Sequence, residues 1–411
     1  MATPQSAPSA ENSSLNNSEP TPSQESTTSS RNALIVGSIA LFTDMLIHGL
    51  AVPVLPLLPS VVEQGPAATG LLFSSYAIAM IISTFFAGRM VDKCGPKTPL
   101  MIGLITLAVA TLIFSTGGPY PLLFLARFAQ GIAGGMSWVA ALSLIAATTS
   151  FEQRGQSMGI AMSTITLGVL IGPPLSGFLV EHFDTAIPFI VGAAVALFDG
   201  LLRIFLIKGS PRVSDDAGGP LSVFQVNGSP AIVAAIIIGA GVLSGIEPVL
   251  PLHLEANALT IGLLFGLASL AAIIANPIVG SLMTTYSSKL LIGSGVLITG
   301  GSLLIIGCST HLWHTCVGMV LLGVSSALIL APTTTLIGEQ GFRSTPPTLG
   351  GSFALYNFAY AAGLAFGPVV TGLGVQHYGF APAMAATCGV FLLLGGLSVP
   401  YLPSRAVGAD T

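Results

Sequence analysis

The chain is organised as long apolar segments separated by short polar ones. Each apolar segment is near the ~20 residues that a helix needs to cross the hydrocarbon core of a bilayer. We predict membrane-spanning helices at about 32–58, 68–90, 98–116, 119–147, 155–181, 185–208, 230–254, 260–284, 289–309, 312–338, 348–375 and 380–402. The pattern therefore predicts an all-α membrane protein with twelve transmembrane helices in two six-helix bundles.

The two bundles are inferred from the longest polar break after the N-terminal segment. Residues 209–229 form that break and predict a cytoplasmic linker between a first bundle at 31–208 and a second at 230–405. Residues 1–30 are rich in Ser, Thr, Pro, Asn and Gln and lack an apolar run, which is typical of a disordered tail. We expect this tail to be cytoplasmic.

The two predicted bundles share short sequences at corresponding places. Gly172-Pro173 in the fifth segment is echoed by Gly367-Pro368 in the eleventh, and residues 53–56 and 248–251 both read Pro-Val-Leu-Pro. Such echoes indicate internal repeats related by an axis normal to the membrane.

Charge is scarce, and its placement supports the same topology. Only 7% of residues are charged, against about 25% in soluble domains. With both termini in the cytoplasm, ten of the twelve Lys and Arg fall in cytoplasmic segments or at cytoplasmic helix ends, as the positive-inside rule expects. Arg203 and Arg127 are the two inside predicted helices. The net charge of −4 does not indicate a nucleic-acid partner.

Catalytic and cofactor motifs are not found in the sequence. There is no nucleophile elbow and no phosphate-binding loop, and the four cysteines lack metal-ligand spacing. We therefore expect no enzyme activity, no cofactor and no metal site. Without an ATP site, transport would draw its energy from an ion gradient or from the substrate's own gradient.

Residues 88–97 form a charged island between two apolar segments. Such a cluster is too costly for hydrocarbon, so we predict a loop at the membrane surface with a tight turn at Gly95-Pro96. We expect a network of charges here to latch the two bundles together as a gate. The positions assigned to this gating motif are Gly88, Arg89, Asp92, Lys93, Gly95 and Lys97.

This loop, together with two further stretches, resembles the major facilitator superfamily over about residues 31–405. Arg127-Phe128-x-Gln130-Gly131 is similar to the family's helix 4 motif. Residues 168–177 are similar to the helix 5 motif of its antiporter branch, through Gly168, Gly172, Pro173 and Gly177. The resemblance implies antiport for that stretch, although generic helix packing explains its glycines nearly as well.

Within the family, the chain resembles the vesicular amine transporters and their drug–proton antiporter relatives. The matching stretches include Asp44 with the Pro-Val-Leu-Pro sequence at 53–56, and Glu247 with its counterpart at 248–251. Two positions depart from the amine transporters, where Tyr76 stands in place of a lysine and Asn357 in place of an aspartate. This pattern does not require monoamine transport, and coupling would rest on fewer carboxylates.

Three residues are candidates for proton coupling. Asp44 lies at mid-depth in the first helix, where a carboxylate is costly and is by default a functional hypothesis. Arg127 lies at a matching depth in the fourth helix, so the two could form an ion pair or relay, and the resemblance implies a coupling role for this arginine. His48 lies one turn beyond Asp44 and could accept its proton. The structural alternatives are hydroxyl-bonded packing for Asp44, an interhelical tether for Arg127 and simple packing for His48.

Five residues are candidates for substrate contact. Glu247 lies beside Pro248, which would let the seventh helix bend. The others are an amide and three aromatic residues within predicted spans, and packing is the alternative role for each of them. The five candidates are Glu247, Asn357, Tyr76, Trp138 and Tyr356.

The function predicted is proton-coupled efflux, by alternating access, of a small amphipathic organic compound such as a drug, toxin or secondary metabolite. A cationic substrate is left open, because the Glu247 carboxylate could bind either a cation or a proton. The expected partners are that substrate, protons and the lipid bilayer, with the chain acting as a monomer. We expect the plasma membrane first, and a vacuolar or vesicular membrane second. A facilitative uniporter or importer of the same fold remains open, as does a non-transporting membrane sensor.

Overall fold

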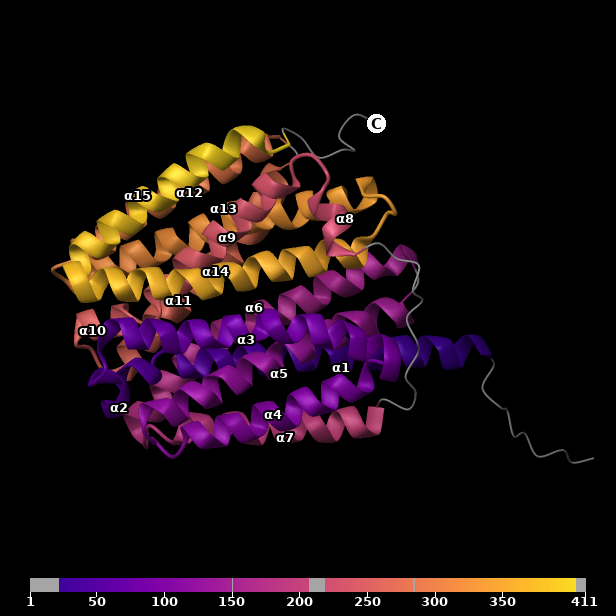
Figure 1. The fold of residues 1–411 in the computed structure, drawn as a ribbon, viewed down its shortest axis with the longest axis horizontal. Coiled ribbons are helices and arrows are strands. Elements are labelled where there is room, and N and C mark those ends of the chain that lie inside the picture. The colour runs from indigo at the N-terminus through magenta and orange to yellow at the C-terminus, as the bar shows by residue number, and fades with distance from the viewer. Residues whose placement is uncertain (1–21, 150, 207–218, 284, 404–411) are drawn as a thin grey trace, which may run out of the picture.

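The computed structural model describes residues 22–149, 151–206, 219–283 and 285–403. These residues form a bundle of long helices with short connections (Figure 1). In chain order the helices are α1 Pro22–Ala51, η1 Leu55–Leu57, α2 Pro59–Val62, α3 Gly65–Cys94, α4 Lys97–Phe114, α5 Tyr120–Thr148, α6 Phe151–His182, α7 Ile187–Leu206, α8 Pro220–Phe224, α9 Ser229–Ile246, α10 Leu250–Leu254, α11 Ala258–Leu282, α12 Ser288–Gly307, α13 Leu312–Arg343, α14 Leu349–Tyr378, α15 Phe380–Ser398 and η2 Val399–Tyr401.

Twelve segments of the described chain are long and apolar enough to cross a membrane, from Ser30–Leu57 to Phe380–Tyr401. They coincide with the twelve predicted spans, so the predicted fold class of an all-helical, multi-pass membrane protein is confirmed. The predicted bundle boundaries remain a prediction.

Two of the segments expected to be irregular are partly helical. Helix α1 begins at Pro22, so residues 22–30 are not part of a disordered tail as predicted, and residues 1–21 lie outside the described residues. Extending an existing helix adds one backbone hydrogen bond for each residue ordered, which favours this extension even through Ser and Thr. In the predicted linker, Pro220–Phe224 forms the short helix α8, and residues 207–218 lie outside the described part.

The helices alternate in direction, so the bundle has two distinct ends. The end that carries α8 and the turn between α3 and α4 is called the linker end below. The opposite end carries α2 and α10 and is called the α2/α10 end. Figure 1 shows the linker end on the right and the α2/α10 end on the left.

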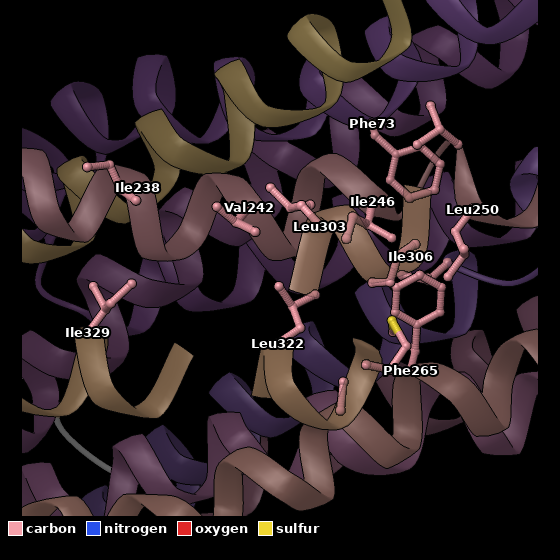
Figure 2. Close-up of a cluster of buried hydrophobic side chains, with 14 of the residues drawn as sticks. Phe73, Ile238, Val242, Ile246, Leu250, Phe265, Leu303, Ile306, Leu322 and Ile329 are labelled. Carbon is pink, nitrogen blue, oxygen red and sulfur yellow. The ribbon is translucent and has the colours of Figure 1, made fainter. Parts of the chain in front are cut away.

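The interior is packed with aliphatic and aromatic side chains, and the outer surface is apolar as well. A large buried cluster joins side chains of α3, α9, α11, α12 and α13, including Phe73, Val242 and Phe265 (Figure 2). Large apolar residues such as Leu197 and Phe205 on α7 are exposed on the outside. A surface of this kind is suited to lipid, in which the bilayer replaces water as the solvent.

The internal repeat predicted from the sequence echoes is present as a repeated hydrogen bond. Ser176 of α6 donates to the carbonyl of Leu50 of α1 at 2.6 Å. Thr371 of α14 donates to the carbonyl of Gly245 of α9, also at 2.6 Å, and both pairs are 126 residues apart in the sequence. The pairing of α6 with α1 is therefore reproduced by the pairing of α14 with α9.

Helices from the first half pack along helices from the second half at two seams. Helix α3 lies along α14, and α6 lies along α11. Toward the α2/α10 end these contacts involve backbone. A Cβ added at Gly70 of α3 would overlap the carbonyl oxygen of Pro368 of α14, and one added at Gly262 of α11 would overlap that of Pro173 of α6. The two halves are therefore closely joined at this end of the bundle.

Candidate functional site

A buried polar network occupies the middle of the bundle, and Asp44 of α1 forms one end of it. The Oδ2 atom of Asp44 accepts two hydrogen bonds, from the hydroxyl of Tyr76 at 3.0 Å and from the indole N–H of Trp138 at 3.1 Å. Its other oxygen, Oδ1, is buried and has no hydrogen-bond partner. The free Oδ1 is therefore the atom of this carboxylate that is available to a proton.

Arg127 of α5 lies at the centre of the network and is fully buried. Its guanidinium donates to Gln130 Oε1 at 3.0 Å and contacts His48 Nδ1 at 3.1 Å. Its charge also faces aromatic rings, 4.9 Å from the ring centroid of Tyr76 and 5.4 Å from that of Phe73. Aromatic faces attract cations, so these rings partly compensate the buried charge.

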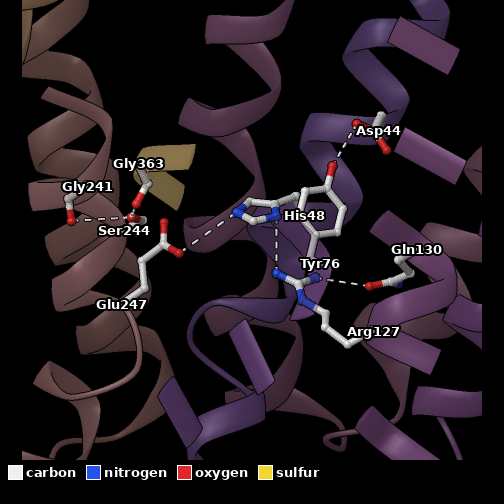
Figure 3. A network of polar contacts seen from close by, with 9 residues as sticks. All are labelled: Asp44, His48, Tyr76, Arg127, Gln130, Gly241, Ser244, Glu247 and Gly363. Carbon is white, nitrogen blue, oxygen red and sulfur yellow. Dashed lines mark hydrogen bonds and ion pairs between the residues drawn. The ribbon is translucent and has the colours of Figure 1, made fainter. Parts of the chain in front are cut away.

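The predicted ion pair between Asp44 and Arg127 is not formed. The ring of Tyr76 lies between them, with its hydroxyl on the carboxylate and its face toward the guanidinium (Figure 3). The prediction compared only depths along two helices, and depth does not fix the direction in which side chains point. The relay alternative stays a prediction, with Tyr76 as the residue between the two charges.

His48 connects this network to the second half of the chain. A guanidinium has donors only, so Nδ1 of His48 accepts from Arg127 and the ring proton lies on Nε2. That Nε2 faces Glu247 Oε2 of the second half at 3.8 Å, which is longer than a hydrogen bond. Glu247 can therefore move away from His48 without breaking a strong hydrogen bond, so this contact between the halves is easily separated.

Local sequence explains the position of Glu247. Helix α9 ends at Ile246 and α10 begins only at Leu250. Proline at position 248 lacks a backbone N–H and disfavours a continuous helix. The predicted bend of the seventh span is present, and it places Glu247 at the break, pointing toward His48 (Figure 3).

A cavity of about 400 Å³ lies beside the network, on the side of the linker end. Its wall is made by α5, α6, α9, α11, α13 and α14, so both halves of the chain contribute. Trp138 forms part of the wall while its indole N–H holds Asp44. Tyr356 and Tyr360 of α14 form another part, with nearly parallel rings 6.2 Å apart.

The structure brings only some of the predicted substrate residues to this cavity. Trp138 and Tyr356 line it, whereas Tyr76 and Glu247 belong to the polar network beside it. Asn357 is buried outside the cavity wall, and its Oδ1 has no hydrogen-bond partner. Substrate contact by these residues stays a prediction.

Sequence reasoning missed most of the polar wall. Asn276 of α11 and the hydroxyls of Ser326, Thr334 and Thr335 of α13 line the cavity. The run Thr333-Thr334-Thr335 inside an apolar span was a usable signal, because hydroxyls in spans often face other helices or water-filled space.

The predicted gating motif lies at the junction of α3 and α4, at the linker end. Gly95 ends α3 with φ of +75°, a conformation that favours glycine, and so provides the predicted tight turn. Lys93 is exposed beside it, and Lys97 begins α4. The side chains of Arg89 and Asp92 lie outside the described part of the structure, so the predicted latch stays a prediction.

The predicted helix 5 motif lies in α6, where it contacts both halves. A Cβ added at Gly168 or Gly172 would crowd the backbone of α1, and one added at Gly177 would crowd that of α11 at Ala258. Pro173 and Pro174 are both within the helix. The motif thus packs α6 tightly against its own half and against the other half.

A second buried charge pair has a structural role. Arg203 and Asp199 of α7 pair with each other, and Arg203 also donates to the carbonyl of Leu100 of α4. The four-residue spacing places the two side chains on the same face of the helix, which suits such an intrahelical pair. It ties α7 to α4, and among the described residues it makes no hydrogen bond to the Arg127 network, which it reaches only through the weak long-range effect of the Arg203 charge on Asp44.

Comparison with known proteins agrees with this fold. The family model of the Major Facilitator Superfamily matches residues 37–257 and 231–410. The chain therefore belongs to the Major Facilitator Superfamily, a family of transporters rather than enzymes.

Sequence identity to individual relatives is low. The chain is 27% identical to the human chromaffin granule amine transporter, over 83% of this chain and 65% of that protein. It is also 27% identical to the vesicular acetylcholine transporter of Drosophila melanogaster, over 87% of this chain and 69% of that protein. The chain thus spans about two thirds of the length of these relatives. Among solved structures, an inward-facing bacterial homologue of the human lysosomal transporter Spinster has a TM-score of 0.70 at 12% identity, covering 90% of this chain and 95% of that one.

Proposed function

We propose that the chain is a proton-coupled antiporter that exports a small amphipathic organic molecule by alternating access. The observation that supports it most directly is the buried network from Asp44 through Tyr76, Arg127 and His48 to Glu247. This network joins the two halves of the chain beside a cavity that both halves line. A protonation event in it can therefore alter a contact between halves that move relative to each other.

The charges of the network suggest how many protons it holds. Arg127 is a permanent cation, and Asp44 and Glu247 are two carboxylates, all three being buried. With one proton shared between the carboxylates the cluster is neutral, which a low-dielectric interior favours. We propose that the network exchanges about one proton per transport cycle on this ground.

The contacts of Trp138 suggest how cargo and proton are linked. The indole lines the cavity and its N–H holds Oδ2 of Asp44. Cargo that packs against the indole holds its N–H on Asp44, and a hydrogen bond donated to a carboxylate stabilises the ionised form, so cargo binding favours loss of the proton from Asp44. Loss or gain of the proton then alters the contacts of Tyr76 and Arg127, and through them the His48–Glu247 contact between the halves.

Charge distribution supports a cytoplasmic linker end. Lys93, Lys97, Lys289 and Arg343 lie at ends of helices there. The connections at the α2/α10 end contain no Lys or Arg in the sequence but do contain Glu63, which fits the positive-inside rule. We propose the plasma membrane as the location, with a vacuolar or vesicular membrane second, and the similarity to vesicular and granule transporters favours the second.

The test is transport by purified protein in liposomes with an acidic lumen. Cargo addition should release protons from the lumen in the wild type, and Asp44→Asn should abolish this release. Asp184→Asn is the matched control, because Asp184 is an exposed carboxylate in the loop before α7. The backbone N–H of Ala186 donates to it at 3.1 Å and holds the pKa of that carboxyl below its usual value, so it stays ionised during the assay.

Two outcomes would contradict the proposal. Proton release that persists in Asp44→Asn would remove Asp44 from the coupling path. Cargo flux that survives a protonophore unchanged would favour the facilitative uniporter instead.

A further inference from the structure

The side chains that line the cavity indicate which chemical class of cargo it can bind. Of the lining side chains that the structure describes, none is Asp, Glu, Lys, Arg or His. The polar groups are the hydroxyls of Ser and Thr, one carboxamide, the indole N–H of Trp138 and the phenol hydroxyls of Tyr356 and Tyr360. The rest of the wall is apolar. Nothing in this wall neutralises a full charge on a bound molecule.

The carboxylates nearest the cavity are not part of its wall. Asp44 lies behind Trp138 and Tyr76, which both donate to its Oδ2, and Glu247 faces His48. Glu339 of α13 follows the lining residue Thr335 by one turn toward the linker end, outside the cavity wall, where it has an interaction of its own. An ammonium group in the cavity would therefore be taken from water without a partner of opposite charge, which is costly.

The hydroxyls of α13 are oriented to accept hydrogen bonds. Thr334 donates its own proton to the carbonyl of Leu330 at 2.7 Å, one turn back along the helix. The oxygen of Thr334 also interacts with the hydroxyl of Tyr356, and its remaining lone pair can accept from a hydroxyl or N–H of the cargo. The tyrosine rings add flat apolar surface, on which an aromatic or polycyclic molecule can pack.

We propose that the cavity binds an uncharged, hydroxylated, aromatic or polycyclic molecule in preference to a protonated amine of the same shape. The volume of about 400 Å³ lies within the range of small-molecule sites. This inference names the substrate class of the antiporter proposed above and rests on that proposal for the role of the cavity.

The two tryptophans of the chain make the proposal testable by fluorescence. Trp138 lines the cavity, and Trp313 is 62% exposed at the start of α13. The variant Trp313→Phe leaves Trp138 as the single reporter, and Trp138→Phe leaves Trp313 as the matched control for optical artefacts. The probes are neutral hydroxylated anthraquinones, flavonoids and isocoumarins, each paired with an aminoalkyl derivative that carries an ammonium on the same rings.

The expected result is saturable quenching of Trp138 by the neutral member of at least one pair, with Trp313 unaffected. Its ammonium derivative should bind at least about tenfold more weakly, because its charge loses water without gaining a partner. Thr334→Val, which keeps the shape and removes the acceptor, should weaken binding of the hydroxylated compound by about three- to tenfold.

Two results would overturn the proposal. One is equal or tighter binding of the ammonium derivatives, which the aromatic walls would permit if cation–π attraction dominated. The other is the absence of saturable Trp138 quenching by every neutral probe. The binding assay needs no pH gradient, so its result is separate from the antiport test. Neutral-selective binding without proton movement would reject antiport alone, and amine-selective binding with proton movement would reject the cargo class alone.

Discussion

The indole N–H of Trp138 lies 3.1 Å from Oδ2 of Asp44, so one wall residue of the cavity directly holds the buried carboxylate. The binding of cargo in the cavity and the protonation of Asp44 are therefore linked through this one hydrogen bond. This relationship leads to predictions that separate the binding of cargo from its coupling to protons.

Replacing Trp138 by Phe should damage coupling more than binding. The ring still covers part of the wall, so cargo affinity should stay within about threefold, while the hydrogen bond to Asp44 is lost. We expect the pH dependence of transport to shift, with protons moved per cargo reduced. The measurement is a pH profile of cargo flux and proton flux in the same liposomes. A uniform loss of affinity with an unchanged profile would show that Trp138 only shapes the wall.

Tyr76→Phe tests the hydroxyl between Asp44 and Arg127. The ring stays against the guanidinium and against His48, whose ring centroid lies 4.8 Å away, so the fold should be kept. Loss of a hydrogen bond to an ionisable carboxyl should reduce coupled transport by about tenfold or more. Thermal unfolding serves as the check on folding, and normal coupled transport by this variant would rule out the relay through Tyr76.

Gly70→Ala tests the close junction of the halves at the α2/α10 end. The new methyl group would overlap the carbonyl of Pro368, so the conformation joined at this end should become less populated. Spin labels on Glu63→Cys and Tyr378→Cys, in a background without the native cysteines, would report a longer distance between the halves. Gly301→Ala is the control, because a Cβ there meets nothing within 4 Å. An identical distance distribution in Gly70→Ala would refute the role of this junction.

The Asp199–Arg203 pair should affect stability and leave coupling intact. Arg203→Ala would strand a buried carboxylate and cost about 3–5 kcal/mol of unfolding free energy. Thermal unfolding in detergent measures the loss, and Arg203→Lys should recover part of it. Protein that survives should show the wild-type pH dependence, and a shifted profile would instead connect this pair to the proton path.

The sequence predicted the fold better than the site because the two depend on different signals. Twelve apolar segments and the placement of Lys and Arg were sufficient for the spans, since a bilayer imposes both patterns. The network residues Asp44, Arg127, His48 and Glu247 were also found, because polar groups are conspicuous within apolar spans. Their partners were not all predicted, since helix rotation decides which side chains meet.

The cavity was the least predictable part. Its wall combines short stretches of six helices. A serine or threonine hydroxyl in such a wall can equally be satisfied by a backbone carbonyl one turn back in its own helix, as the hydroxyl of Thr334 is. The threonine run that contains Thr334 signals a polar face on its helix, but neither it nor Asn276 shows from sequence whether that face lines a cavity or packs against another helix. Tertiary arrangement alone makes that distinction.

The central claim is that cargo and a proton compete through Asp44, and proton release on binding tests it most directly. Purified protein in weak buffer, with no membrane gradient, would receive the neutral compound that quenches Trp138 best, while the pH is recorded. The account predicts release of about one proton per bound cargo in the wild type and in Asp184→Asn, and none in Asp44→Asn. Equal release in Asp44→Asn, or no release in the wild type despite saturable binding, would contradict it.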